Sequence, residues 1–535
     1  MKIQILRFTF ALLAIFSLSF IVEAQSRTDV YAITNARIVT VSGRTLERGT
    51  IVVRNGLIEA VGETVRVPAD ARTIDGTGMT VYPGFFDAMT NLGMAAPAAP
   101  RPPGQQAAQT TQTQQQPSAQ SNSNYPDGLR PEETAQEQLR AGEAQFETQR
   151  NAGFTTALTV PRGGVLQGQS AVINLAGDSA SGMIIRAPFA QHVTFTTLGG
   201  GTYPTSLLGT FSALRQMLLD AQRLQEYRKV FAANPRGVRR PEADASLEAL
   251  LPVLNRAMPI VFNANAEREI IRALDLAQEF NLRAIIAGGT EAWKVADRLK
   301  KQDVPVLLSL DFPRRTTIAS PEADPEPLQV LRLRAEAPQN AARLAQAGVK
   351  FAFQSGQMRN ITDFLPNAGK AIESGLSREA AIRAMTLSPA EIFGVENQLG
   401  SIETGKIANL VVSKGDVFAK DKQLTHVFVD GRLFEPRREE RRPTTPGTTT
   451  PGATQPGAAA NVGGNYDITI EIPGQPTQGT LILTQQGNIL TGSLQTQYGT
   501  ANIREGKISP DGFTFLSTVD FAGRTLDITV NGTVT

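Results

Sequence analysis

The sequence predicts an α/β protein built around a (β/α)8 TIM-type barrel, and three observations lead to this fold class. Short apolar strand patterns alternate with helical periodicity across residues 130–397, as in a barrel of alternating strands and helices. Residues 30–80 before this region and 398–436 after it have the patterns of short strands. A chain of 535 residues is long enough for such a barrel and one or two smaller modules.

The composition excludes several classes of protein. The 52 Lys and Arg residues nearly balance the 50 Asp and Glu residues, and no long basic block occurs, so nucleic acid is not expected as a partner. The sequence contains no Cys, which excludes disulfides, Cys-ligated zinc and a lipid-modified cysteine.

Residues 1–24 have the pattern of a secretory signal peptide. Lys2 and Arg7 form a basic start, and the apolar run of residues 8–22 is short for a membrane span. Val22-Glu23-Ala24 fits a small-residue cleavage site; an uncleaved N-terminal anchor is the alternative. No later segment is apolar enough to span a bilayer. We therefore expect an exported protein, periplasmic or secreted, with no membrane partner after cleavage.

Turn signals and periodicity place the individual elements. Residues 32–41 read as a strand, and residues 50–55 and 57–62 flank Asn55-Gly56, a strong hairpin signal. Strands are expected, in chain order, at residues 154–160, 171–175, 192–195, 259–263, 283–287, 304–308 and 349–353. Helices are expected at residues 131–151 and 206–231 and from about residue 266, with Thr290 as a helix cap and a capping box at Ser388-Pro389-Ala390-Glu391.

Three segments differ from the rest of the chain. Residues 95–124 consist of Ala, Pro, Gln, Thr and Ser with almost no apolar bulk, so we expect disorder there. This insert follows the first barrel strand and would lie at the barrel mouth, either as a lid or as an insertion without function. A Pro/Thr/Gly linker, residues 437–464, precedes an all-β module at residues 465–535 with about six strands.

The stretch from Val81 to Met94, which contains "VYPGFFDAMTN", reads as a strand that opens into a loop. Together with "NARIVTVSG", "GTIVVRNGLIEAVG" and the later "LGSIETGKIANLVVSKGD", it resembles the amidohydrolase superfamily, in its imidazolonepropionase-like branch. The resemblance covers about residues 30–436. It implies a barrel at residues 83–397 and a small composite β-sandwich made from two flanks, residues 28–82 and 398–436.

The resemblance also implies a hydrolase of non-peptide C–N bonds that uses one or two zinc or similar divalent ions. The family usually reads Asp-x-His-x-His after Pro-Gly, and its two metal-binding histidines correspond here to Met89 and Asn91. The other ligand positions correspond to residues near His192, to Asn263, to Gly288 or else Ala287, and to Gly356. The chain has two histidines, which is too few for the usual four-histidine arrangement in one subunit. We therefore expect no metal of the known kind and no other cofactor.

Two interpretations of function remain open. In the first, the chain is a pseudoenzyme that binds a small molecule or serves as the non-catalytic partner of an active relative, in a homo- or hetero-oligomer. In the second, it is an active hydrolase of a small cyclic amide or dipeptide-like substrate with a non-standard or metal-free site. The candidate catalytic groups are then His192, as a base or residual ligand, and Glu291 with Asp311 as an acid/base pair. Ser355 lacks the Gly-x-Ser-x-Gly setting of a serine nucleophile. For His192, hydrogen-bonded packing is the alternative role.

Overall fold

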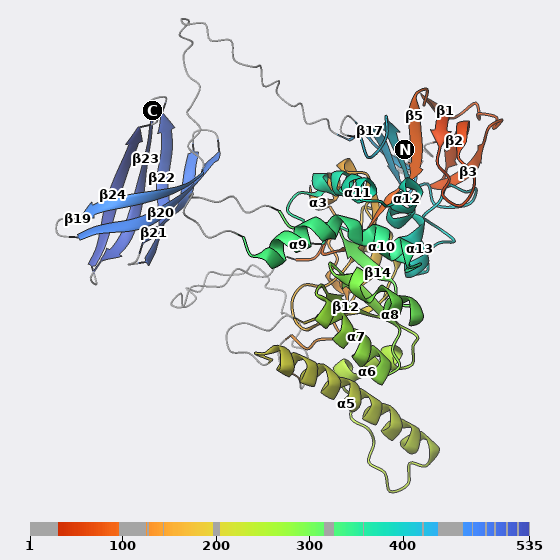
Figure 1. The fold of residues 1–535 in the computed structure, drawn as a ribbon, viewed down its shortest axis with the longest axis horizontal. Helices are drawn as coiled ribbons and strands as arrows, with labels where there is room; N and C mark the ends of the chain where they lie inside the picture. Colours follow the sequence, from red (N-terminus) through yellow and green to blue (C-terminus); the bar gives the residue numbers. More distant parts are fainter. Residues whose placement is uncertain are drawn as a thin grey trace, which may run out of the picture. The chain divides into compact units, whose positions relative to one another are not determined.

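The computed structural model describes residues 30–95, 125, 128–142, 144–195, 204–314, 326–356, 358–419 and 422–436, and most of 464–533 (Figure 1). The predicted signal peptide and nearly all of the predicted insert and linker lie outside the described residues. The chain divides into two compact units, residues 1–439 and 440–535. None of the helices in the described part of the chain is both long enough and apolar enough to cross a membrane.

Strands from the beginning and the end of the first unit form one sheet. One eight-stranded sheet has the order β18-β17-β16-β5-β1-β2-β3, with β4 paired to β1. Its strands are β1 (Tyr31–Ile38), β2 (Leu46–Arg54), β3 (Leu57–Gly62), β4 (Arg72–Asp75), β5 (Met79–Pro83), β16 (Leu410–Lys414), β17 (Gln423–Val429) and β18 (Arg432–Phe434). Because β5 pairs with both β1 and β16, the two flanks form one continuous hydrogen-bonded sheet.

Two further sheets follow in the middle of the unit. The first, in the order β10-β9-β7-β6, contains β6 (Phe85–Thr90), β7 (Phe154–Thr159), β9 (Ala171–Asn174) and β10 (Ile184–Arg186). The second, in the order β15-β14-β13-β12-β11-β8, contains β8 (Leu166–Gln169), β11 (Gln191–Thr194), β12 (Ile260–Ala264), β13 (Ala284–Gly288), β14 (Val306–Ser309) and β15 (Phe351–Gln354). Strands β11 to β15 are mutually parallel, and β6 is parallel to β7. The carboxyl ends of each parallel set therefore meet at one edge.

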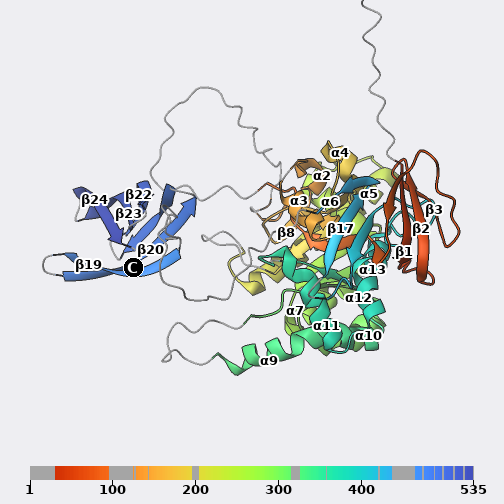
Figure 2. The ribbon, with the colours of Figure 1, turned by 90° about the horizontal axis from the view of Figure 1, so that it is seen from above.

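Helices connect and cover these strands, which makes the unit a mixed α/β fold. They are α2 (Ala135–Gln138), α3 (Ala144–Asn151), α4 (Ala180–Met183), α5 (Leu207–Ala233), α6 (Ala245–Leu254), α7 (Glu267–Glu279), α8 (Ala296–Lys301), α9 (Leu328–Glu336), α10 (Asn340–Gln346), α11 (Phe364–Glu373), α12 (Arg378–Met385) and α13 (Leu387–Phe393). Short 3-10 turns lie at η2 (Ala292–Val295), η3 (Ala337–Gln339) and η4 (Ile361–Asp363). Helices α10, α11 and α12 are neighbours along one side of the strands in both views (Figure 2).

One apolar cluster draws on both central sheets. Its buried strand residues come from β6, β7, β9, β12, β13, β14 and β15: Phe86, Ala88, Leu158, Val172, Val261, Ile285, Ala287, Leu307 and Ala352. Phe393 of α13 closes the cluster and contacts Phe86 with a ring-centroid separation of 6.3 Å. A larger cluster fills the space between the strands and the helices. The two sheets therefore share one apolar interior, and burial of this surface is the main stabilising term.

The second unit is a six-stranded antiparallel meander, as the alternating pattern predicts. It contains β19 (Gly464–Ile472), β20 (Gln475–Gln486), β21 (Ile489–Thr496), β22 (Gly499–Ser509), β23 (Gly512–Phe521) and β24 (Arg524–Thr533), in that order. Leu481, Leu483, Ile503 and Phe515 are buried, which marks one face of the meander as its core.

Three local predictions are wrong. Residues 131–151 form two helices, α2 and α3, because the chain leaves the helical conformation at Leu139, where ψ is 129°. Ser388 is not an N-cap, since α13 begins at Leu387 and Thr386 precedes it. Thr290 does not cap a helix; its hydroxyl donates to Asn265 Oδ1 at 3.0 Å.

Candidate functional site

A cavity of about 450 Å³ lies at the carboxyl ends of the central strands. Its lining comes from the ends of β6, β11, β12, β13, β14 and β15 and from the loop after β7. This position is where ligands bind in folds with parallel strands and covering helices, since the loops at that edge can vary without disturbing the core.

The cavity brings together most of the positions predicted from the sequence. Met89, Asn91, Asn263, Gly288 and Gly356 all line it, although they are far apart in the sequence. Each follows or ends a different strand, except the first two, which both belong to the end of β6. Five positions that the family resemblance assigns to metal ligands thus line one cavity.

Asp311 also lines the cavity and is the one carboxylate in its lining. It lies two residues after the end of β14, is exposed, and its backbone N–H donates to Ser309 Oγ at 3.1 Å. Its side chain is therefore available to a ligand in the cavity.

His192, expected at the pocket, is not among the residues that line the cavity. It lies on β11, two residues before Thr194, which does line the cavity. The ring is buried and its Nε2 is 2.9 Å from Ser170 Oγ. Burial lowers the pKa of His192 to about 3, so the imidazole is neutral at physiological pH. The structure therefore places the side chain in hydrogen-bonded packing. The other histidine, His426, is half-buried on β17 beside Thr425 Oγ1.

Glu291 also lies outside the cavity lining. Its Oε2 accepts the backbone N–H of Glu267, the first residue of α7, at 2.8 Å. Its Oε1 accepts Lys294 Nζ at 2.6 Å. Burial raises its pKa, but the Lys294 and Glu267 hydrogen bonds outweigh that effect and lower the pKa overall. The carboxylate thus stabilises the start of α7, where the helix dipole favours a negative charge, and it does not pair with Asp311.

The backbone at Gly288 leaves no room for a side chain. Gly288 has φ +85°, a conformation that residues with a Cβ rarely adopt. A Cβ at this position would lie 2.3 Å from Asn265 Oδ1 and 3.2 Å from Asn263 Oδ1. Thr290 Oγ1 holds Asn265 Oδ1 in place. The amide of Asn265 therefore occupies the space that a metal-binding side chain at residue 288 would need.

Gly356, the position that corresponds to the family's carboxylate, is similar but less crowded. Its φ is +60°, and a Cβ there would lie 3.1 Å from Ser309 Oγ and 3.5 Å from Gln354 Oε1. Gln354 is buried, and its Nε2 donates to Leu307 O at 2.8 Å. Its Oε1 accepts no hydrogen bond from any described residue.

A buried carboxylate supports the floor of this region. Asp87, on β6, is fully buried and accepts Ser355 Oγ at 2.5 Å and the Ser355 backbone N–H at 2.9 Å. Burial raises the pKa of Asp87 to about 6. Since Ser355 follows β15, these bonds join the outer strands of the two central sheets.

The donor set of the cavity does not fit zinc or a related divalent ion. Such sites require imidazoles, thiolates or several carboxylates that converge on one point. The lining contains amides, hydroxyls, a thioether and the single carboxylate of Asp311. Among the described residues, no group of three His, Asp or Glu side chains could hold a metal. The chemistry that this cavity offers is hydrogen bonding.

Among the lining residues that the sequence interpretation missed are three with side-chain amides: Gln167, Asn265 and Gln354. Asn265 lies two positions after Asn263, a spacing that places side chains on one face of an extended segment. That signal could have identified it. The other two carry no recognisable motif, because they come from β8 and β15, which meet the cavity only in the folded chain.

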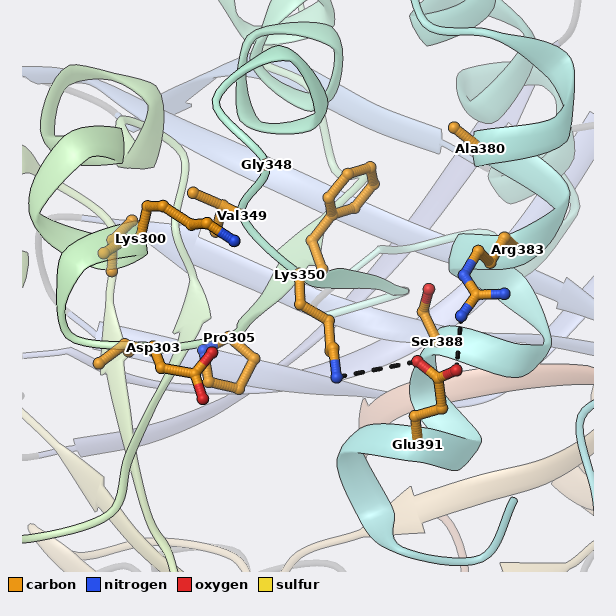
Figure 3. Close-up of a pocket in the computed structure, with 13 residues that line it drawn as sticks. Lys300, Asp303, Pro305, Gly348, Val349, Lys350, Ala380, Arg383, Ser388 and Glu391 are labelled. Carbon is orange, nitrogen blue, oxygen red and sulfur yellow. Dashed lines mark hydrogen bonds and ion pairs between the residues drawn. The ribbon is translucent and has the colours of Figure 1, made fainter. Parts of the chain in front are cut away.

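A second cavity, of about 300 Å³, lies at the amino ends of β14 and β15 (Figure 3). Lys300, Asp303, Lys350, Arg383 and Glu391 are its charged residues. Glu391 pairs with Arg383 at 2.5 Å and with Lys350 at 3.8 Å, so its carboxylate is neutralised within the cavity. This end of the strands is opposite the first cavity.

Comparisons with known proteins relate this chain to amidohydrolases. Residues 257–434 match a family model described as the amidohydrolase family. The crystal structure of an amidohydrolase from Thermotoga maritima MSB8 has a TM-score of 0.61 and 24% sequence identity to this chain, and the match covers 76% of this chain and 100% of that chain. Adenine deaminase from Clostridium botulinum (strain Loch Maree / Type A3) is 38% identical over 64 residues, which are 12% of this chain and 10% of the deaminase. The matched region thus spans about one tenth of the length of these curated relatives.

Proposed function

Since residues 257–434 belong to the amidohydrolase family, we propose that this chain is a catalytically silent member that binds a small molecule in the cavity at the carboxyl ends of its central strands. Its fold is then the predicted (β/α)8 barrel, with β6, β7 and β11 to β15 among its strands. The shared apolar cluster and the hydrogen bonds between Asp87 and Ser355 support closure of the two sheets into one barrel.

The observation that carries this proposal is the chemistry of the cavity lining. Hydrolysis in this family requires a metal that lowers the pKa of a bound water and polarises the substrate carbonyl. By resemblance to the family, the metal-ligand positions that line the cavity are Met89, Asn91, Asn263, Gly288 and Gly356, and at Gly288 the space for a ligand side chain is taken by Asn265. The cavity therefore presents neutral amides where the family has metal ligands, and neutral amides suit a ligand that is bound by hydrogen bonds.

The wider context of the proposal comes from the sequence. A secretory signal at residues 1–24 would place the protein in the periplasm or outside the cell. A silent barrel there would act as a ligand-binding protein or as the non-catalytic partner of an active barrel relative, in a homo- or hetero-oligomer.

A metal-free hydrolase of a cyclic amide or dipeptide-like substrate is the second candidate. Asp311 favours it, because an exposed carboxylate at the cavity could accept a proton from an attacking water. Neither His192 nor Glu291 assists in this alternative, since both are engaged outside the cavity lining. Asp311 would have to act as the general base alone.

Metal content and hydrolysis together test the proposal. The mature protein, residues 25–535, is dialysed against zinc and then against buffer, and bound zinc and manganese are measured by elemental analysis. Less than about 0.1 equivalent per chain supports the proposal. Near-stoichiometric metal would overturn it. Hydrolysis of cyclic amides or dipeptides that is lost in Asp311→Asn but kept in Asp303→Asn, at the opposite cavity, would favour the metal-free enzyme instead.

A further inference from the structure

The charge of the first cavity restricts what it can bind. Among the described residues of its lining, Asp311 is the single ionisable side chain, and none is Lys, Arg or His. A carboxylate or phosphate in the cavity would therefore lie near the negative Asp311 and would meet no positive side chain among these lining residues. Arg162, which is exposed and donates to Asn91 O at 3.4 Å, borders the lining without belonging to it. Because charged groups lose hydration on entering a cavity, such a ligand is disfavoured.

Hydrogen-bond acceptors are gathered at two points of the cavity. Asn263 Oδ1 and Asn265 Oδ1 lie within 3.2 Å and 2.3 Å of the point where Gly288 would carry a Cβ. Ser309 Oγ and Gln354 Oε1 lie within 3.1 Å and 3.5 Å of the corresponding point at Gly356. Four side-chain oxygens thus lie on the cavity wall near the two glycines, with the space at Gly288 itself filled by Asn265.

Gln354 gives independent evidence that a ligand belongs here. The side chain is 1% exposed, and its Nε2 donates to Leu307 O, which fixes Oε1 as the acceptor of the amide. No described residue donates to that oxygen. Buried polar atoms are nearly always hydrogen-bonded, so an unpaired acceptor at a cavity wall calls for a donor from a molecule in the cavity.

The free side chains point to the same kind of molecule. Asn91 Nδ2 already donates to Val160 O at 2.7 Å, which leaves its Oδ1 as an acceptor. The described residues of the lining include no aromatic ring, so they offer no surface for stacking a planar base. Met89 and Val160 provide the apolar part of the wall.

We propose that the cavity binds a small, donor-rich molecule that carries several hydroxyl groups, has no anionic group, and bears an ammonium group beside Asp311, as an amino sugar does. The hydroxyls would donate to the acceptors around Gly288 and Gly356 and to Gln354 Oε1. The inference rests on the proposed function, because it assigns a ligand class to the same cavity.

Three sugars that differ in charge test the ligand class: glucosamine (cationic), glucose (neutral) and glucuronate (anionic). Their binding to the mature protein is measured by isothermal titration calorimetry near neutral pH. We expect affinity in the order glucosamine, glucose, glucuronate. In Asp311→Asn, glucosamine should bind about fivefold more weakly, while glucose is unchanged, because one partly exposed charge pair is lost. Asp303→Asn, which removes the same charge at the opposite cavity, should change neither.

Glucuronate binding as tightly as glucosamine, or no binding of any of the three, would overturn the inference. An equal loss of affinity for all three sugars in Asp311→Asn would also overturn it, since the carboxylate would then not distinguish ligands by their charge. If the sugar titrations fail but the protein holds no metal, the ligand class is wrong and the proposed silent barrel still stands. Stoichiometric metal would instead remove the proposed function itself.

Discussion

Ser355 Oγ donates to Asp87 Oδ2 at 2.5 Å, and the Ser355 backbone N–H donates to Asp87 Oδ1 at 2.9 Å, across 268 residues of sequence. Asp87 is on β6 and Ser355 follows β15, so the pair joins the first and last of the central strands. Met89 and Gly356, which line the cavity, lie within two residues of this pair. A carboxylate that serves no ligand thus fixes the position of two cavity walls.

Asp87→Asn should remove one component of the pH dependence of stability. Burial raises the pKa of Asp87 from 3.8 to about 6, so the folded protein holds this proton more tightly than the unfolded chain does. The stability from this group is complete below pH 3.8 and is lost as the pH rises through about 6. At about 1.4 kcal/mol per pKa unit, the change is on the order of 3 kcal/mol.

Urea unfolding of the wild type and of Asp87→Asn across this pH range would measure the effect. The difference between their free energies of unfolding should shift in favour of the variant as the pH rises. Asp311→Asn, which removes an exposed carboxylate, is the matched control. Parallel stability profiles for the wild type and Asp87→Asn would contradict the assignment of a raised pKa to this carboxyl.

His192→Gln should act in the opposite pH direction. Burial lowers the pKa of His192 from 6.5 to about 3, so the unfolded chain takes up the proton first. The stability from the neutral imidazole is therefore present above pH 6.5 and declines as the pH falls toward about 3. The variant should lose this component of the acid sensitivity. In NMR spectra of the wild type, the His192 ring resonances should not titrate between about pH 5 and 8; a titration midpoint in that range would refute the neutral, packed role.

Glu291→Gln should destabilise the fold by about 1 kcal/mol without changing ligand binding, because the carboxylate interacts with the start of a helix. The wild-type side chain accepts Glu267 N–H and Lys294 Nζ, and it does not line the cavity. Thermal unfolding and sugar titration of the same preparation separate the two effects. A loss of binding with unchanged stability would place Glu291 in the binding site instead.

The sequence predicted the positions of strands and turns better than it predicted which side chains line the cavity. The alternating pattern and the Asn55-Gly56 turn located a hairpin whose two turn residues have φ of 52° and 80°, as such a turn requires. The family resemblance, and not the pattern, singled out the strand-end positions Asn263 and Gly288. The role of Asn265 was not predicted, because it depends on a steric relationship with Gly288 that only the folded backbone creates. His192 was misplaced for a related reason: a strand end alone does not say which residues reach the cavity.

The contact between Asn265 and Gly288 gives the sharpest test of the cavity. Gly288→Ala should destabilise the protein more than Gly356→Ala. Both substitutions meet a positive φ, at a cost of roughly 1–2 kcal/mol, but only the first brings a Cβ to 2.3 Å from an amide oxygen. Asn265→Ala should relieve that clash, so a double-mutant cycle of residues 265 and 288 should show about 1–2 kcal/mol of coupling. Asn265→Ala combined with Gly356→Ala is the control and should be additive. Free energies from urea unfolding decide: additivity of the 265/288 pair would mean that the backbone, and not Asn265, excludes a side chain at residue 288.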